Sequence, residues 1–209
     1  MKSLKIIISI LVLVIALYSF AVAATENSTS EVEYSADMIF VSDQISQRGK
    51  LYYTPLKERR EYTMKGMKQV MIIRRDKGKV WILMPDVGMY MERPLNNQNV
   101  PGDMSNVVIE ESKPLGKELV NGVMTTKYKL IMTMPGQGKV GGFFWKTKDG
   151  ITVKMFVVSK FKDGIREDKA RMKMELKNLK LSRQPSSLFE IPPGYNRMPM
   201  GMPGMGRPF

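Results

Sequence analysis

The chain of 209 residues contains no cysteine and no histidine. Without cysteine it forms no disulfide, so the burial of apolar side chains must hold its fold together. Without histidine it has neither a Ser-His-Asp or Cys-His catalytic system nor a histidine metal site. Carboxylates could still act as general acids or bases, but most acids sit beside lysine or arginine in polar turns, as in Arg75-Asp76-Lys77-Gly78 and Lys148-Asp149-Gly150. We therefore expect a protein that is not an enzyme and needs no cofactor.

The N-terminus has the pattern of a secretory signal peptide. Lys2 and Lys5 precede an apolar run over 6–20, and Ala21-Val22-Ala23 fits the small-residue site of signal peptidase. This predicts a signal peptide over 1–24 and a periplasmic protein. An uncut membrane anchor is the alternative, because the run is nearly the roughly 20 residues that cross a bilayer. Cleavage would remove two lysines and no acid, which lowers the formal net charge from +13 to +11.

Alternation with a period of two residues dominates the chain after a polar spacer over 25–31. This is the period of a β-strand with one buried face. Glycine in sequences such as Asp76-Lys77-Gly78 suits the tight turns of hairpins. One short helix is predicted over 103–111, with Asp103 as its cap. The predicted strands are 32–40, 48–54, 57–64, 67–75, 78–84, 89–92, 123–133, 139–147, 151–161 and 170–181.

These elements predict a mainly β domain over 32–196 built from one antiparallel sheet in simple up-and-down order. An apolar sheet face must pack against another element, and one short helix covers little of it. The sheet must therefore curl into a barrel or half-barrel, which can keep an internal cavity, or fold into a two-layer sandwich.

Three stretches, taken in order, resemble a known group of proteins. They are 48–64, with Arg48-Gly49-Lys50-Leu51-Tyr52-Tyr53 at its start; 71–92; and Leu188-Phe189-Glu190-Ile191-Pro192-Pro193-Gly194-Tyr195. The order is similar to that of exported bacterial proteins of unassigned function related to the LolA/LolB outer-membrane lipoprotein-sorting superfamily. The resemblance implies a half-barrel of antiparallel strands and the carriage of acyl chains, lipids or lipidated proteins through the periplasm.

Methionine is unusually frequent in the predicted strands. Fourteen of the nineteen methionines lie between Met38 and Met174. Methionine adapts to irregular apolar shapes and is over-used on promiscuous binding surfaces, although these residues could simply fill a core. A register error of one residue would invert part of any inward-facing set. The predicted apolar lining is Met38, Phe40, Ile72, Trp81, Leu83, Met89, Met91, Tyr128, Leu130, Met132, Phe144 and Met155.

Two further features support alternative hypotheses. The tail over 197–209 is rich in Met, Pro and Gly, and Met198, Met200, Met202 and Met205 could bind Cu(I) through sulfur. The lysines and arginines are predicted at outward strand positions, where they could attract anionic lipid head groups, contact a protein partner, or only keep the surface solvated. Nucleic acid is not an expected partner of an exported protein. The outward set includes Lys57, Arg59, Arg60, Arg74, Arg75, Lys127, Lys129, Lys146, Lys173 and Lys177.

Overall fold

The computed structural model describes residues 30–198, apart from 44, 65, 97–99, 101, 103, 105–106, 135, 137, 160 and 162–163. The predicted signal peptide, most of the spacer, and Met200, Met202 and Met205 of the tail lie outside the described residues. Met198 is the last described residue, and its backbone N–H donates to the Tyr90 carbonyl at 2.8 Å. Within the described part, no helix has both the length and the apolarity to cross a membrane.

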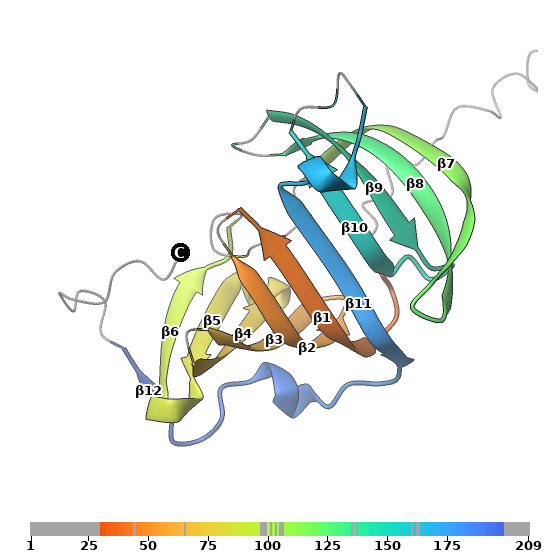
Figure 1. The fold of residues 1–209 in the computed structure, drawn as a ribbon. Coiled ribbons are helices and arrows are strands. Elements are labelled where there is room, and N and C mark those ends of the chain that lie inside the picture. Colours follow the sequence, from red (N-terminus) through yellow and green to blue (C-terminus); the bar gives the residue numbers. More distant parts are fainter. Residues whose placement is uncertain are drawn as a thin grey trace, which may run out of the picture.

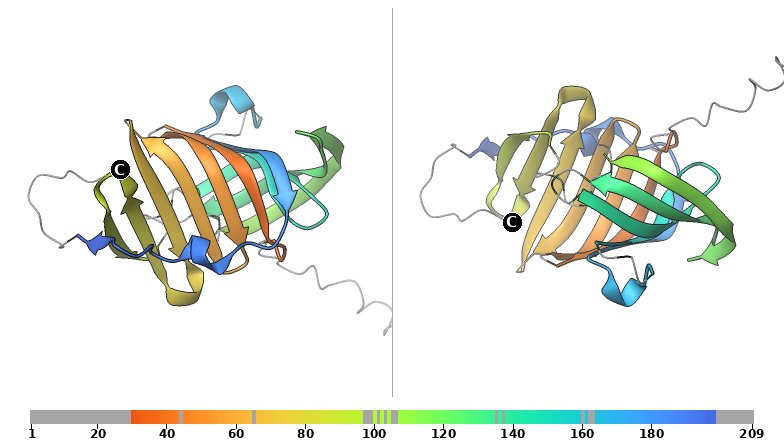
Figure 2. Two further views of the ribbon diagram at one scale, coloured as in Figure 1. Left: turned by 90° about the horizontal axis from the view of Figure 1, so that it is seen from below. Right: turned by 90° about the horizontal axis from the view of Figure 1, so that it is seen from above.

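The described strands form one sheet of twelve strands in the order β12-β6-β5-β4-β3-β2-β1-β11-β10-β9-β8-β7. Two antiparallel meanders, β1–β6 and β7–β11, join where β1 pairs with β11, and only β12 runs parallel to its neighbour. The sheet is open and strongly curled (Figures 1 and 2). The first half of the sheet, β1–β6, therefore faces the second half, β7–β11, across the inner side. The predicted half-barrel is confirmed. The bounds are β1 Tyr34–Ser42, β2 Ser46–Thr54, β3 Lys57–Met64, β4 Met67–Arg74, β5 Lys79–Met84, β6 Met89–Pro94, β7 Val108–Val120, β8 Val123–Met134, β9 Gly138–Lys146, β10 Thr152–Val158, β11 Met172–Leu181 and β12 Asn196–Arg197.

The first strands form where the sequence predicts them. In β1 every second residue from Tyr34 to Phe40 is buried. The turn between β4 and β5 is a single 3₁₀ turn, Arg75–Lys77, which ends at Gly78 with φ 61°, and glycine adopts this left-handed conformation without steric penalty. Similar short 3₁₀ helices are Pro85–Val87, Glu167–Lys169 and Ser186–Phe189. Local alternation and turn chemistry therefore account for most of the sheet.

The predicted helix over 103–111 is wrong. Its second half, from Val108 onward, begins the thirteen-residue strand β7, and Met104 and Val107 belong to neither helix nor strand. Branched side chains at Val107, Val108 and Ile109 favour extended backbone, and β7 pairs with β8 along its length. Strand β7 was not predicted at all, and neither was the two-residue β12.

The link between β6 and β7, residues 95–107, connects opposite edges of the sheet and is called the crossing segment below. Val100 packs with Tyr62, Met71 and Ile82 on the inner side of the first half of the sheet. Val107 packs with residues of β8 to β10 on the inner side of the second half. These two described residues of the crossing segment therefore pack on the concave side of the sheet.

The outer face of the first half is covered by residues 182–198, called the C-terminal strap. It runs from the end of β11 to β6, with which its own strand β12 pairs (Figure 1). Phe189 is fully buried against Val70, Ile72, Trp81 and Leu83. The outer face of the second half carries Trp145 and Phe156, which pack against Phe161 and Ile165 of the β10–β11 connection.

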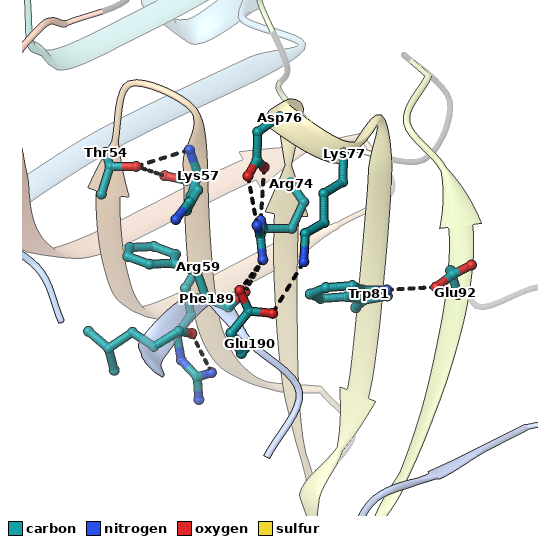
Figure 3. Close-up of polar contacts among 11 residues, drawn as sticks. Thr54, Lys57, Arg59, Arg74, Asp76, Lys77, Trp81, Glu92, Phe189 and Glu190 are labelled. Atoms are coloured by element: carbon teal, nitrogen blue, oxygen red, sulfur yellow. Dashed lines mark hydrogen bonds and ion pairs between the residues drawn. The ribbon is translucent and has the colours of Figure 1, made fainter. Parts of the chain in front are cut away.

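Two arginines bind the strap to the sheet (Figure 3). Arg59 Nη1 donates to the Leu188 carbonyl at 3.0 Å. Arg74 Nη1 donates to the Phe189 carbonyl at 3.1 Å, and the same guanidinium pairs with Glu190 and makes a bidentate contact with Asp76. Arg74 is nearly inaccessible to solvent, so these contacts between the sheet and the strap are buried.

Candidate ligand-binding site

A cavity of about 360 Å³ lies on the inner side of the curled sheet, between β1–β3 and β8–β11. This volume lies within the range of roughly 300–1,000 Å³ that is common for small-molecule sites. Both meanders and the crossing segment contribute to its wall. The residues that line it are Ser30, Tyr34, Met38, Phe40, Leu51, Tyr53, Glu58, Arg60, Arg75, Gly102, Met104, Val107, Ile109, Leu130, Met132, Phe144, Lys146, Gly150, Ile151, Thr152, Met155, Met174 and Leu176.

The main part of the cavity wall is apolar and rich in methionine. Strand register builds it, because Phe40 pairs with Met174, Met174 with Met155, and Met155 with Phe144. Directly paired residues of antiparallel strands point to the same face, so these side chains form one row across four strands. Met38, Met104 and Met132 add three more thioethers to the wall. Such a surface can adjust to a flexible apolar ligand.

The crossing segment closes one side of the apolar part. Gly102 has φ 72°, and a Cβ atom there would lie 2.6 Å from Cε2 of Phe40. Only glycine combines this backbone conformation with so close an approach. Met104 and Val107 also line the cavity.

The opposite end of the cavity is polar. Glu58 accepts a hydrogen bond from Arg60 Nε at 2.5 Å, and its other oxygen lies 3.6 Å from Arg75 Nη2. Glu58 and Arg60 are both nearly buried. Both side chains point inward because they alternate with Arg59 along β3, and Arg60 pairs with Leu51, another lining residue. The ion pair is therefore part of the cavity wall.

Two tyrosines stand beside this ion pair. The rings of Tyr34 and Tyr53 are stacked with centroids 4.9 Å apart, and the Tyr53 hydroxyl donates to the Ser30 carbonyl at 3.2 Å. Burial, together with the negative charge of Glu58, raises the pKa of Tyr53 to about 12 and shifts the pKa of Tyr34 in the same direction. Both hydroxyls are thus protonated at neutral pH and give the polar end neutral hydrogen-bonding groups.

A comparison with protein families identifies the family to which the sequence belongs. A family model described as a domain of unknown function, DUF4412, matches residues 35–163, more than half of the chain. The chain belongs to the DUF4412 family. The matched residues include every strand of the cavity wall except β11. No curated protein matches the sequence.

Solved structures resemble this DUF4412 protein in fold. An uncharacterised conserved protein from Thermus thermophilus matches with a TM-score of 0.50 and 12% identity, over 80% of this chain and 91% of that chain. MucB, which another match shows from Pseudomonas aeruginosa in complex with MucA, gives 0.49 and 10% identity, over 80% of this chain and 60% of that one. A putative outer membrane lipoprotein-sorting protein domain from Vibrio parahaemolyticus gives 0.32 and 12% identity, over 75% and 89%. The family model agrees with the sequence resemblance to proteins of unassigned function, and the Thermus thermophilus structure supports a shared fold alone.

Half of the predicted lining residues lie in the cavity wall of the DUF4412 domain. Met91 and Tyr128 are partly buried on the inner side but do not line the cavity, and Met89 is half-buried beside β12. The six in the cavity wall are Met38, Phe40, Leu130, Met132, Phe144 and Met155.

Ile72, Trp81 and Leu83 lie on the other face of the sheet. They pack against Phe189 of the C-terminal strap. Their neighbours Met71 and Ile82 face inward instead. Both faces of β4 and β5 are apolar, because the crossing segment packs on the inner face and the strap on the outer face. Their sequences therefore lack the alternation that would identify the inner face.

The charged residues of the cavity wall were placed wrongly from the sequence. Arg59, Arg60, Arg74, Arg75 and Lys146 were all predicted to point outward, yet Arg60, Arg75 and Lys146 line the cavity. Arg74 does lie on the outer face, where the C-terminal strap buries it. A signal was present in the sequence. Adjacent strand residues point to opposite faces, so Arg59 and Arg60 cannot both point outward.

The described residues include no group of three or more Asp or Glu side chains placed to hold a metal ion. Among the described residues, the charged groups of the cavity wall are an ion pair, a second arginine and one lysine, beside a larger apolar surface. This arrangement can hold an amphiphilic molecule by burial of its apolar part and by contact with its polar end.

Proposed function

We propose that this DUF4412 protein is a non-catalytic binding protein that holds an acyl chain, either of a free lipid or of lipidated cargo, in the inner cavity. The observation that carries the proposal is the cavity of about 360 Å³ with its methionine-rich wall. Each methylene group moved from water into such an environment gains about 0.8 kcal/mol. Apolar contact alone can therefore provide most of the affinity for a long chain.

The predicted signal peptide supports a periplasmic location for this binding protein. The formal net charge of +11 for the processed chain would attract it to anionic lipid head groups, where lipids enter and leave. Lipid, lipidated protein and an anionic membrane surface are thus the partners that the proposal names.

The proposal is tested by filling the cavity with a larger side chain at Met132. This residue is fully buried in the cavity wall, so a Met132→Trp side chain must occupy the cavity or displace its wall. Met124→Trp is the matched control, since Met124 lies on the same strand but is 58% exposed. Overpacking costs about 1–3 kcal/mol, less than the roughly 5–15 kcal/mol by which domains are stable, so circular dichroism should show both variants folded.

Lipid is extracted from natively purified protein and quantified per chain by mass spectrometry. Wild type and Met124→Trp should carry bound lipid in similar amounts, and Met132→Trp about tenfold less, because loss of a few buried methylene contacts at 0.8 kcal/mol each reaches that factor. Lipid-free wild-type protein, or equal lipid in both variants, would contradict the proposal.

A further inference from the structure

Four methionines lie close together at the edge of the sheet where β6 pairs with β12. Met84 of β5 pairs directly with Met89 of β6, and Met91 lies two residues further along β6. Met198 directly follows β12. These four are called the edge methionines below. The described cavity wall includes none of them, so they are not part of the site described above.

Strand register puts three of the edge methionines on the inner face. Met91 packs on that face with Met71 and Ile82. Met89 points the same way because residues two apart on a strand share a face, and Met84 does so because directly paired residues share a face. Paired side chains have Cβ atoms about 4.5–5.5 Å apart, so the long thioether groups of Met84 and Met89 can reach one ion.

Strand β12, which lies beside β6, brings Met198 to the same place (Figure 1). Arg197 lies opposite Tyr90, and the backbone N–H of Met198 donates to the Tyr90 carbonyl at 2.8 Å. The parallel register therefore continues by one residue and places Met198 opposite Met91. Arg197 donates to Glu92, the neighbour of Met91. Because adjacent strand residues point to opposite faces, Met198 shares the face of Met91.

The edge methionines are partly accessible to solvent, unlike methionines of the cavity wall. Each edge methionine is half-buried, whereas Met38, Met132 and Met155 are buried. A sulfur that only fills a core needs no access to solvent, and a partly accessible sulfur can meet an ion from solution. The thioether is a soft, uncharged ligand that suits Cu(I).

The methionine-rich tail continues the chain from this place. Met200, Met202 and Met205 follow Met198 in the sequence and lie outside the described residues. Two residues of chain span at most about 7 Å, so the chain allows Met200 to meet an ion bound beside Met198. We infer that the edge methionines bind Cu(I) and that the tail methionines complete the site. This inference is independent of the acyl-chain function, because the cavity wall takes no part in it.

Methyl NMR identifies the methionines that bind the ion. Full-length protein with ¹³C in its methionine methyl groups is titrated with Cu(I) in the absence of oxygen, with ascorbate to keep the ion reduced. Single Met→Leu variants assign the resonances. Those of the edge methionines should shift with about one ion per chain, and those of Met38, Met132 and Met155 should not. Mg²⁺, which prefers oxygen ligands, should shift none of them.

The combined variant Met89→Leu and Met91→Leu removes two ligands from the sheet. Leucine has nearly the volume of methionine, and packed cores tolerate such swaps, so circular dichroism should show a folded protein. The affinity for Cu(I), measured by competition with the chelator bicinchoninate, should fall at least about tenfold, because even groups that only orient metal ligands contribute about 10–100-fold. Met124→Leu is the matched control, since Met124 is 58% exposed on β8, far along the sheet from β6. It should keep wild-type affinity.

A second variant, with Met200→Leu, Met202→Leu and Met205→Leu, tests the tail in the full-length chain. Its affinity should also fall at least about tenfold, while the edge methionine resonances still shift at higher Cu(I) concentration.

Three outcomes would overturn the inference. If no edge methionine resonance shifts in wild type, these residues do not bind Cu(I). If the Met89→Leu and Met91→Leu variant binds as tightly as wild type, any copper site belongs to the tail alone. If the tail variant keeps wild-type affinity, the tail does not complete the site. The lipid measurements proposed above are separate from all three outcomes, so the acyl-chain function can stand or fail without this site.

Discussion

Replacement of Phe189 by alanine tests whether the C-terminal strap is part of the folded domain. Phe189 is fully buried, and its ring fills the space over Val70, Ile72, Trp81 and Leu83 on the outer face of β4 and β5. Substitution of a buried phenylalanine by alanine removes its transfer free energy and leaves a cavity, which together cost about 3–5 kcal/mol. For a domain of this size that loss lowers the melting temperature by roughly 6–20 °C.

Leu181→Ala is the control for this prediction. Leu181 ends β11, just before the strap, but is 57% exposed, so its truncation should change the free energy of unfolding by no more than about 0.5 kcal/mol. Urea denaturation followed by circular dichroism gives both values. With a slope of about 2 kcal/mol/M, the midpoint of Phe189→Ala should fall by about 1.5–2.5 M.

The lipid content of Phe189→Ala distinguishes a structural strap from a part of the binding site. Phe189 lies on the face opposite the cavity, so the variant should retain wild-type lipid at temperatures where it is folded. A loss of stability below about 1 kcal/mol would show that the strap does not cover the outer face in solution.

Two further predictions concern pH and the crossing segment. The hydrogen bonds from Arg74 lower the pKa of Asp76 below its ordinary value, so the stability they contribute is present above about pH 4 and lost as the pH falls through the folded-state pKa; Asp76→Asn should flatten that acid limb of the urea midpoint. The raised pKa of Tyr53, about 12, contributes stability that is complete below about pH 10 and lost as the pH rises through 12. Because there is no histidine, the urea midpoint should change little between about pH 5 and 8. A step in that interval would refute the assignment of the pH dependence to Asp76 and Tyr53. Gly102→Ala should destabilise more than Gly66→Ala in urea, because both glycines have positive φ, at a cost of about 1–2 kcal/mol for alanine, but only the Gly102 Cβ would meet the Phe40 ring; equal losses would show that the crossing segment does not press on Phe40.

The strands whose inner face could be predicted from the sequence are those with one covered face. In β1 the residues Tyr34, Ala36, Met38 and Phe40 alternate with more exposed neighbours, so the strand and its inner face both follow from a period of two. Met38 and Phe40 were accordingly assigned to the side of the sheet that holds the cavity. The turn at Gly78 could be predicted for a separate reason, the backbone conformation that it requires.

Strand β7 lacks the signal because it is an exposed edge strand. Eleven of its thirteen residues are exposed, and it contains Pro114 and Gly116 at an irregularity in its pairing with β8. Proline is tolerated on an edge strand because one side of the strand needs no ladder hydrogen bond. With no buried face there is no alternation, and Asp103 with Met104, Val107 and Val108 then resembled a capped helix.

The faces of β4 and β5 were not predictable for the opposite reason. Val70, Met71, Ile72 and Ile73 are all buried. Met71 and Ile73 face inward, where Val100 of the crossing segment packs, and Val70 and Ile72 face outward, against the strap. A strand that is covered on both faces is apolar throughout. Only knowledge of the strap, more than a hundred residues away, would have excluded Ile72, Trp81 and Leu83 from the cavity.

The position of the cavity follows from where the C-terminal strap and the crossing segment pack on the sheet. The strap covers the outer face of β4 and β5, and Val100 of the crossing segment covers the inner face of the same strands. That half of the sheet is thereby packed on both sides, with Ile72, Ile73 and Val80 wholly inaccessible. Between β1–β3 and β8–β11, the described residues of the crossing segment that reach the inner face are Gly102, Met104 and Val107, and of these Gly102 brings no side chain. A curved sheet can retain space on its inner side, and the cavity lies beside these three residues. Unbranched methionines line that space, and they can close around a ligand of variable shape more readily than branched side chains with defined rotamers.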